Sequence, residues 1–192
     1  MSVYIEYPAD WIGVPAFGEG EVFATPAAWA TALSDELIAE SGVAPTPEAR
    51  QSLVNALTMM GTGTRERGAS ASYIHYPHWG STPELVDVLL IERATVGDSP
   101  AHEVAGSGEP DLLRPATITD IVTAKGLRGS LVIRHAPMDE DAPHVVTLRA
   151  SCALDVGDDY LVLGTATTDL AAFEAFRPSF LALIESVTVS ED

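Results

Sequence analysis

The clearest pattern of apolar and polar positions runs over residues 143–189. Apolar residues alternate with polar ones over residues 146–156, which predicts a half-buried antiparallel strand. Gly157-Asp158-Asp159 supplies residues that tolerate turn geometry, and residues 160–167 favour a returning strand. After Asp169, large apolar residues recur at helical spacing, namely Phe173, Phe176, Phe180, Leu183 and Ile184. This stretch predicts a β-hairpin whose apolar face is covered by a closing helix.

The N-terminal part of the chain predicts one strand followed by two helices. Residues 2–7 alternate in the manner of a strand. Thr25-Pro26 and Thr46-Pro47 each place a threonine before a proline, as at the cap and first position of a helix. Gly42 and Gly61 are the predicted ends of these two helices. Two helices joined by a short loop form an αα-hairpin.

The middle of the chain predicts further strands. Residues 69–75 favour one strand, and residues 85–96 favour another because their β-branched share is high. Ser81-Thr82-Pro83-Glu84, just before the second, also resembles a helix start. Residues 117–123 and 127–134 predict a hairpin, whereas residues 99–115 are expected to be mostly loop around a short extended segment.

Together these elements predict an α+β fold. We expect a mainly antiparallel sheet of about six to seven strands, flanked by the N-terminal αα-hairpin and the C-terminal helix. Strands cluster and helices segregate, which disfavours an alternating βαβ arrangement. The length of 192 residues fits a single globular domain over residues 1–192.

The charge of the chain narrows the range of partners. The net charge is −18, from 28 acidic and 10 basic residues, and Lys125 is the one lysine. A surface of this sign repels phosphate and anionic lipid, so we expect neither nucleic acid nor membrane as a partner. No apolar run approaches the roughly 20 residues of a spanning helix, and the first residues lack the features of a secretory leader. We therefore expect a cytoplasmic protein, with Cys152 buried and inert on its strand.

Two glycine-rich segments lack the rest of a catalytic motif. Residues 61–68 follow a helix instead of a strand and do not end in Gly-Lys-Ser/Thr, so they predict a solvated connector and not a phosphate loop. Gly106-Ser107-Gly108 lacks the Gly-x-Ser-x-Gly pattern and its strand-to-helix setting. We therefore expect no catalytic residues and a protein that is not an enzyme.

His75, Tyr76, His78 and Trp79 form the most conspicuous polar and aromatic cluster. Tryptophan and tyrosine often anchor protein interfaces, so we expect an exposed loop here that binds another protein. In the competing interpretation Trp79 fills the core. A metal clamp would need the turn at Pro77 to bring the two histidines together, and no further ligand stands at ordinary spacing. We expect no metal and no other cofactor.

His135 and His144 flank the acidic segment Asp139-Glu140-Asp141. The alternate oxygen ligands, glycine and distal glutamate of a calcium loop are missing, so the segment predicts a solvated hairpin tip. An alternative function remains, in which His75, His78, His135 or His144 converge in a small-molecule- or metal-binding enzyme. A third hypothesis is a homo-oligomer formed through an exposed sheet edge.

Two segments give the chain a resemblance to the Mog1/PsbP-like fold. Residues 6–15, Glu-Tyr-Pro-Ala-Asp-Trp-Ile-Gly-Val-Pro, resemble the strand, proline and tryptophan opening of such domains. Residues 169–188 resemble their final helix, with its aromatic stripe and an Ile-x-Ser-Val exit. The resemblance implies an α/β/α sandwich and a non-enzymatic role as a protein-binding or accessory module. Members include a small-GTPase regulator, photosynthetic accessory subunits, bacterial envelope proteins and effector chaperones. The early αα-hairpin and the lack of a leader depart from the family pattern.

Overall fold

The computed structural model describes residues 2–109, 113–138 and 144–190. The chain divides into two compact units, one of Ala9–Asp87 and the other of Met1–Pro8 with Val88–Asp192. We call these the helical unit and the sheet unit. Strand β4 contributes residues to both, because the division falls between Asp87 and Val88.

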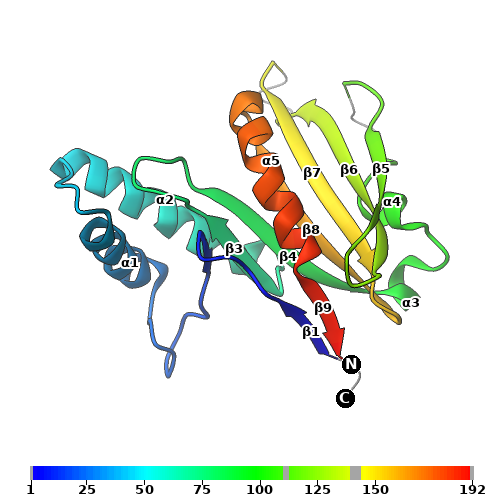
Figure 1. Cartoon of the computed structure of the whole chain (residues 1–192), viewed down its shortest axis with the longest axis horizontal. Helices are drawn as coiled ribbons and strands as arrows, with labels where there is room; N and C mark the ends of the chain where they lie inside the picture. Colours follow the sequence, from blue (N-terminus) through cyan, green and yellow to red (C-terminus); the bar gives the residue numbers. More distant parts are fainter. Residues whose placement is uncertain (1, 110–112, 139–143, 191–192) are drawn as a thin grey trace. The chain divides into compact units, whose positions relative to one another are not determined.

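Seven strands form one antiparallel sheet in the order β2-β3-β4-β8-β7-β6-β5, and β1 pairs with β9 in a separate two-stranded sheet (Figure 1). The α+β class and the seven-stranded sheet are as predicted. The strands are β1 (Ser2–Ile5), β2 (Trp11–Gly13), β3 (Ala71–His75), β4 (Glu84–Glu92), β5 (Thr117–Val122), β6 (Arg128–Pro137), β7 (Val146–Asp155), β8 (Asp159–Thr167) and β9 (Val187–Ser190).

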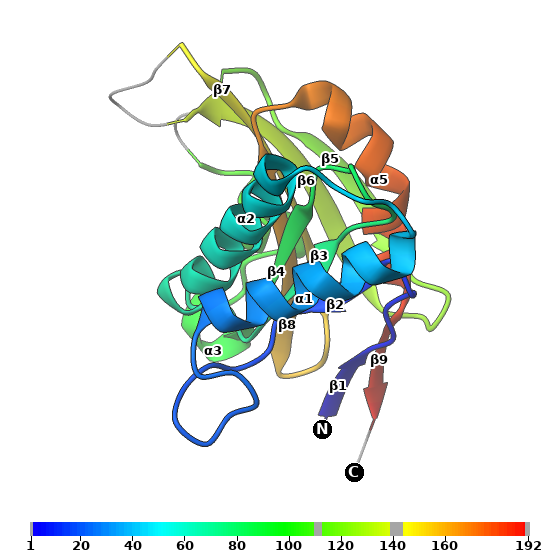
Figure 2. The same cartoon turned by 90° about the vertical axis from the view of Figure 1, so that its left-hand side faces the viewer.

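The helical unit contains the predicted αα-hairpin, made of α1 (Pro26–Ser41) and α2 (Pro47–Glu66). Thr25 caps α1, since its Oγ1 accepts a hydrogen bond from the Ala28 N–H at 3.2 Å. Gly42 ends α1 with φ of 65°, a left-handed conformation that glycine adopts without steric cost. The two helices lie side by side, as Figure 2 shows. Their buried residues join β3 in one core, made of Trp29, Ala30, Leu53, Val54, Leu57, Ile74 and Tyr76.

The predicted end of α2 at Gly61 is wrong, because the helix continues to Glu66. Gly61 is buried, and a Cβ there would lie 3.2 Å from Pro26 and Trp29 and 3.3 Å from Phe17. The glycine therefore serves close packing and does not terminate the helix, since tertiary contacts override its low helix propensity. Residues 61–66 are accordingly helix, and not the solvated connector that was expected.

The sheet unit has helices on both faces of its strands. The C-terminal helix α5 (Leu170–Glu185) begins at its predicted cap, Asp169, and buries its aromatic stripe. Helix α5 packs against β8 on one face of these strands, and the fully buried Cys152 of the neighbouring strand β7 lies near Glu185 of α5. On the opposite face, Ala105 follows α4 (Ala101–Val104) and packs in a core with Val132, Ala153, Tyr160 and Val162.

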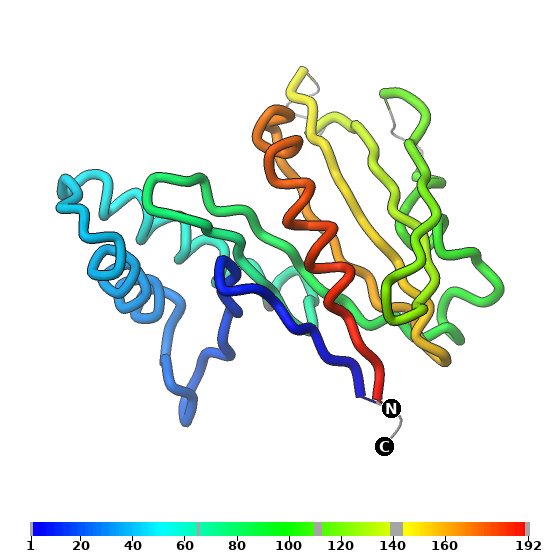
Figure 3. The backbone as a smooth tube through the Cα atoms, viewed as in Figure 1, coloured from blue at the N-terminus to red at the C-terminus, as the bar shows by residue number. Residues whose placement is uncertain are grey.

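Three short elements of the sheet unit differ from expectation. The strand predicted over residues 85–96 ends at Glu92, and α3 (Arg93–Val96) follows it. Its turn is anchored by Arg93, which lies 4.3 Å over the Tyr160 ring and donates to the Gly157 carbonyl. Helix α4 lies in the expected loop, held by its apolar contacts. The terminal strand β9 was not predicted, and it pairs with β1 at the two ends of the chain (Figure 3).

Candidate binding groove

An open groove of about 600 Å³ lies within the helical unit. Three segments line it: the residues around the start of β2, the last turn of α1 with the residues after it, and the loop after β3. We call it the groove. Its lining residues are Ala9, Asp10, Ile12, Leu37, Glu40, Ser41, Val43, Tyr76, Pro77, His78 and Trp79.

Pairing of β2 with β3 places Asp10 beside the predicted cluster. Trp11 is opposite His75 in the register, and the Tyr76 N–H donates to the Asp10 carbonyl at 2.9 Å. His75 is buried, with its Nε2 atom 2.9 Å from Oδ2 of Asp10 and its ring centroid 5.1 Å from that of Trp11. His75 therefore supports the groove from behind and does not line it.

The loop after β3 is exposed only in part. Tyr76 is 6% exposed and belongs to the core, and its hydroxyl oxygen accepts from the Gly80 N–H at 3.2 Å. Pro77 and His78 are exposed, while Trp79 is half-buried and packs against the core of the helical unit. The expectation of an exposed loop thus holds at Pro77 and His78 and is wrong for Tyr76. Trp79 both contacts the core and lines the groove.

Local hydrogen bonds hold the tip of this loop. Nδ1 of His78 lies 3.0 Å from Oγ of Ser81 and 3.1 Å from the Trp79 carbonyl oxygen. The Ser81 N–H also donates to the His78 carbonyl at 3.1 Å, which closes a turn. The turn directs the imidazole toward its own loop and fixes the segment that carries Trp79.

The ionisable side chains of the groove are mainly acidic. Asp10 and Glu40 lie on different segments of its lining, and neither lysine nor arginine stands among the lining residues of the described chain. The lining also contains the apolar residues Ile12, Leu37 and Val43, and Val43 is 48% exposed. A cation with an apolar portion matches this chemistry, since carboxylates attract it and the apolar side chains gain from burial.

The other two histidines of the enzyme hypothesis lie in the sheet unit. His135 is buried in β6 and contacts the Arg114 guanidinium, whose Nε atom is 3.1 Å from His135 Nδ1. Burial, and then the charge of Arg114, lower the pKa of His135. His144 is exposed, and the acidic segment at residues 139–141 lies outside the described residues. Within the described ranges, no three His, Cys, Asp or Glu side chains are grouped so as to hold a metal ion.

The serine between two glycines also has a histidine neighbour. Oγ of Ser107 lies 2.9 Å from Nδ1 of His102, and the Ser107 N–H donates to the His102 carbonyl at 2.9 Å. Both contacts close the turn after α4, so the pair has a structural role in ending that helix.

Sequence reasoning found the aromatic side of the groove and missed its acidic side. Asp10 and Glu40 carry no local signal, because acidic residues are frequent throughout the chain. Their placement depends on the pairing of β2 with β3 and on the position of the last turn of α1. The turn-forming Pro8-Ala9-Asp10 segment before Trp11 was the nearest available indication.

In comparisons with known proteins, no family model matches the chain, and no curated protein matches it. Of the helices that the structure describes, none has the length and apolar character needed to cross a bilayer. The groove itself is therefore the basis for assigning a function.

Proposed function

We propose that this chain is a non-enzymatic binding module that recognises another protein in the cytoplasm. The partner contributes a positively charged segment with one large apolar side chain. The observation that supports this proposal is the composition of the groove, where the half-buried Trp79 and two carboxylates, Asp10 and Glu40, line one depression. The resemblance to Mog1/PsbP-like proteins, which mostly act as partners of other proteins, supports the same proposal.

The apolar lining would supply the affinity. Ile12, Leu37 and Trp79 are each partly buried and packed against the core, so their exposed portions form a firm surface. An apolar side chain of the partner gains about 25 cal/mol for each Å² that it removes from water. Tryptophan is prominent among the residues that dominate interface energetics. The apolar anchor would sit against Trp79.

The carboxylates would supply selectivity and a fast encounter. A lysine or arginine flanking the anchor would meet Asp10 or Glu40, and charge complementarity of this kind mainly raises the association rate. The net charge of −18 extends the attraction beyond the groove. A second copy of this chain carries the same net charge, which disfavours it as the occupant.

The proposal also relies on the rigidity of the groove. Asp10 is fixed by His75, and the loop is fixed by the hydrogen bond from the Gly80 N–H to the Tyr76 hydroxyl. Gly42 ends α1 in a left-handed turn that leads directly to Val43. A preorganised surface loses little conformational entropy on binding.

The test is affinity capture from the cytosol of the source organism with four matched baits. Tagged wild-type protein, Trp79→Ala and Glu40→Lys are compared with Glu21→Lys, which makes the same charge change on an exposed loop outside the groove lining. We expect one stoichiometric partner that is retained by wild type and by Glu21→Lys, lost with the two groove variants and weakened at high salt. Equal retention by all four baits would contradict the proposal, as would the absence of any retained protein.

A further inference from the structure

A second cavity, of about 520 Å³, lies in the helical unit and shares no lining residue with the groove. It is bounded by the segment before the first helix, the last turns of α2 and the start of β3. We call it the hydroxyl pocket. Its lining residues are Val14, Pro15, Ala16, Phe17, Pro26, Gly61, Thr62, Thr64, Gly68, Ala69, Ser70, Ala71 and Ser72. The volume falls within the range of about 300–1,000 Å³ that is usual for small-molecule sites.

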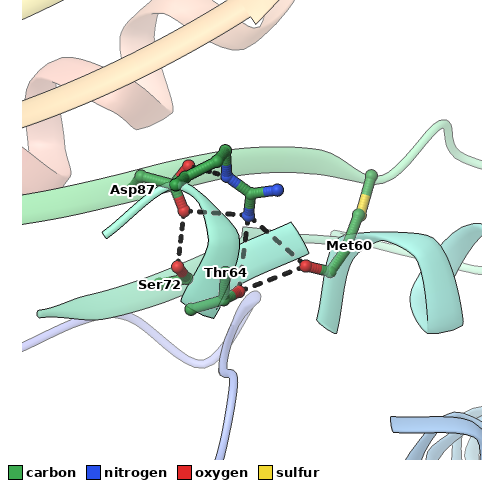
Figure 4. Close-up of polar contacts among 5 residues, drawn as sticks. Met60, Thr64, Ser72 and Asp87 are labelled. Carbon is green, nitrogen blue, oxygen red and sulfur yellow. Dashed lines mark hydrogen bonds and ion pairs between the residues drawn. The ribbon is translucent and has the colours of Figure 1, made fainter. Parts of the chain in front are cut away.

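Ser72 lines this pocket and is 1% exposed. Its hydroxyl donates to Oδ1 of Asp87, because an ionised carboxylate can only accept (Figure 4). Arg67 donates to both oxygens of the same carboxylate, which fixes the Asp87 side chain beside Ser72. The hydrogen of the Ser72 hydroxyl is thereby committed, and the oxygen keeps its lone pairs. Donation to the carboxylate polarises the hydroxyl, which makes its oxygen a better acceptor.

The two threonines in the last turns of α2 behave in the same way. Thr62 Oγ1 donates to the Thr58 carbonyl at 2.8 Å, and Thr64 Oγ1 donates to the Met60 carbonyl at 3.1 Å. A carbonyl oxygen has no hydrogen to give, so both hydroxyl hydrogens are directed into the helix. Each threonine oxygen retains acceptor capacity, and Thr64 uses part of it for the Arg67 guanidinium at 3.4 Å.

Glycine at position 63 makes this arrangement possible. A Cβ on Gly63 would overlap the Arg67 guanidinium, which lies over the last turn of α2 on its way to Asp87. The charge of Arg67 is paired with Asp87, and Arg67 is not among the residues that line the pocket. The described wall therefore combines acceptor oxygens with apolar surface from Val14, Phe17 and the prolines.

We infer that the hydroxyl pocket binds a small organic molecule that carries a primary ammonium group on an apolar body. The ammonium supplies three N–H donors and no acceptor, which matches the hydroxyl oxygens of Ser72, Thr62 and Thr64, whose hydrogens are already donated elsewhere. The apolar body would lie against Phe17 and Val14. The net charge of −18 favours a cation over an anion of the same shape. This inference does not rest on the proposed protein partner, because the two sites share no lining residue.

Three probes of similar size test which polar group the pocket prefers: 2-phenylethylammonium, phenylacetate and 2-phenylethanol. Each is titrated into the isotope-labelled protein, and the backbone amide resonances of the lining residues are followed by NMR. We expect 2-phenylethylammonium to shift the resonances of Ser72, Thr64 and Ala71 and to saturate, with phenylacetate inactive and the alcohol at least tenfold weaker. Equal shifts from the acid or the alcohol would overturn the inference, as would no shift with the ammonium probe.

Variants of the chain test the location. Ser72→Ala leaves the Arg67–Asp87 pair in place and should weaken the ammonium probe about tenfold, the effect of one lost hydrogen bond to a charged group. Ala16 lines the pocket and is exposed, so Ala16→Trp should block it without disturbing the core, while Ala24→Trp, exposed and outside the lining, should not. Unchanged affinity in both pocket variants would place the probe elsewhere, and shifts confined to His78 and Trp79 would assign it to the groove.

Discussion

Nε2 of His75 lies 2.9 Å from Oδ2 of Asp10, and this contact joins the buried end of β3 to the lining of the groove. The imidazole is almost fully buried, whereas the carboxylate is 36% exposed. The pair therefore presents a carboxylate to the groove from a fixed backbone position. The register that pairs Trp11 with His75 sets the spacing between them.

Replacing Asp10 by asparagine should cost little stability. The amide keeps the size of the side chain and can still contact His75, so we expect the free energy of unfolding to fall by about 0.5–1.5 kcal/mol, the usual range for one hydrogen bond. Urea unfolding followed by circular dichroism measures this change. Glu21→Gln, an exposed neutralisation outside the groove, is the control and should change stability by less than about 0.5 kcal/mol. A larger loss in the control than in Asp10→Asn would contradict the structural role of the pair.

The sequence predicted most of the fold because its strongest signals are local. Alternation along β7 fixes which residues face α5, and the threonine and proline at the start of α1 fix that helix end. The end of α2 was missed because Gly61 is held in the helix by contacts with distant side chains. Strand β9 was missed for a similar reason, since its four residues are stabilised by pairing with the opposite end of the chain.

The candidate site was predicted only where its sequence signal is local. The loop from Tyr76 to Trp79 stands out by its residue types alone, so its role could be proposed from sequence. The burial of Tyr76 could not be predicted from sequence, because it depends on how α1 and α2 pack against β3. Local patterns reveal which face of an element is apolar, whereas a groove requires segments from three parts of the chain.

Gly129 in β6 should not tolerate a side chain. A Cβ there would overlap the Ala153 carbonyl on the neighbouring strand, and backbone atoms cannot move aside as a flexible side chain can. We expect Gly129→Ala to lower the free energy of unfolding by about 1–3 kcal/mol, as overpacking usually does.

Gly164 in β8 is the matched control for that substitution. A Cβ at this position would meet only the Ser151 Oγ atom, at an ordinary 3.6 Å, so Gly164→Ala should be neutral or stabilising by up to about 1 kcal/mol. Both variants are compared by urea unfolding. A loss in Gly164→Ala equal to that in Gly129→Ala would show that the β6–β7 contact is not the cause.

Cys152 should be unreactive in the folded protein. Burial, with a smaller contribution from Glu185, raises the pKa of its thiol to about 12, so only about one thiol in ten thousand is ionised at pH 8. A chromogenic disulfide reagent should label it far more slowly in native buffer than in denaturant. An added cysteine at the exposed position Ala27 should react at once in the same sample. Rapid labelling of Cys152 before denaturation would contradict its placement under α5.

His135 should make the sheet unit less stable in acid. Its pKa is lowered from 6.5 by burial and by Arg114, so the unfolded chain binds a proton more readily than the folded one. Stability from this group is complete above about pH 6.5 and is lost progressively as the pH falls below it. The stability difference between wild type and His135→Gln should therefore shrink between about pH 7.5 and pH 5. Parallel curves for the two proteins, or an NMR titration midpoint of His135 above 6.5, would contradict this assignment.

The measurement that tests the central claim most directly is site-specific photo-crosslinking in the native cytosol. A benzophenone amino acid replaces His78 at the exposed rim of the groove, and the same residue replaces Glu21 in a control. We predict that position 78 captures one protein through a segment that contains a lysine or arginine beside a large apolar residue, and that position 21 does not. Capture of the same proteins from both positions, or of none from position 78, would contradict the assignment of the groove as a protein-binding site.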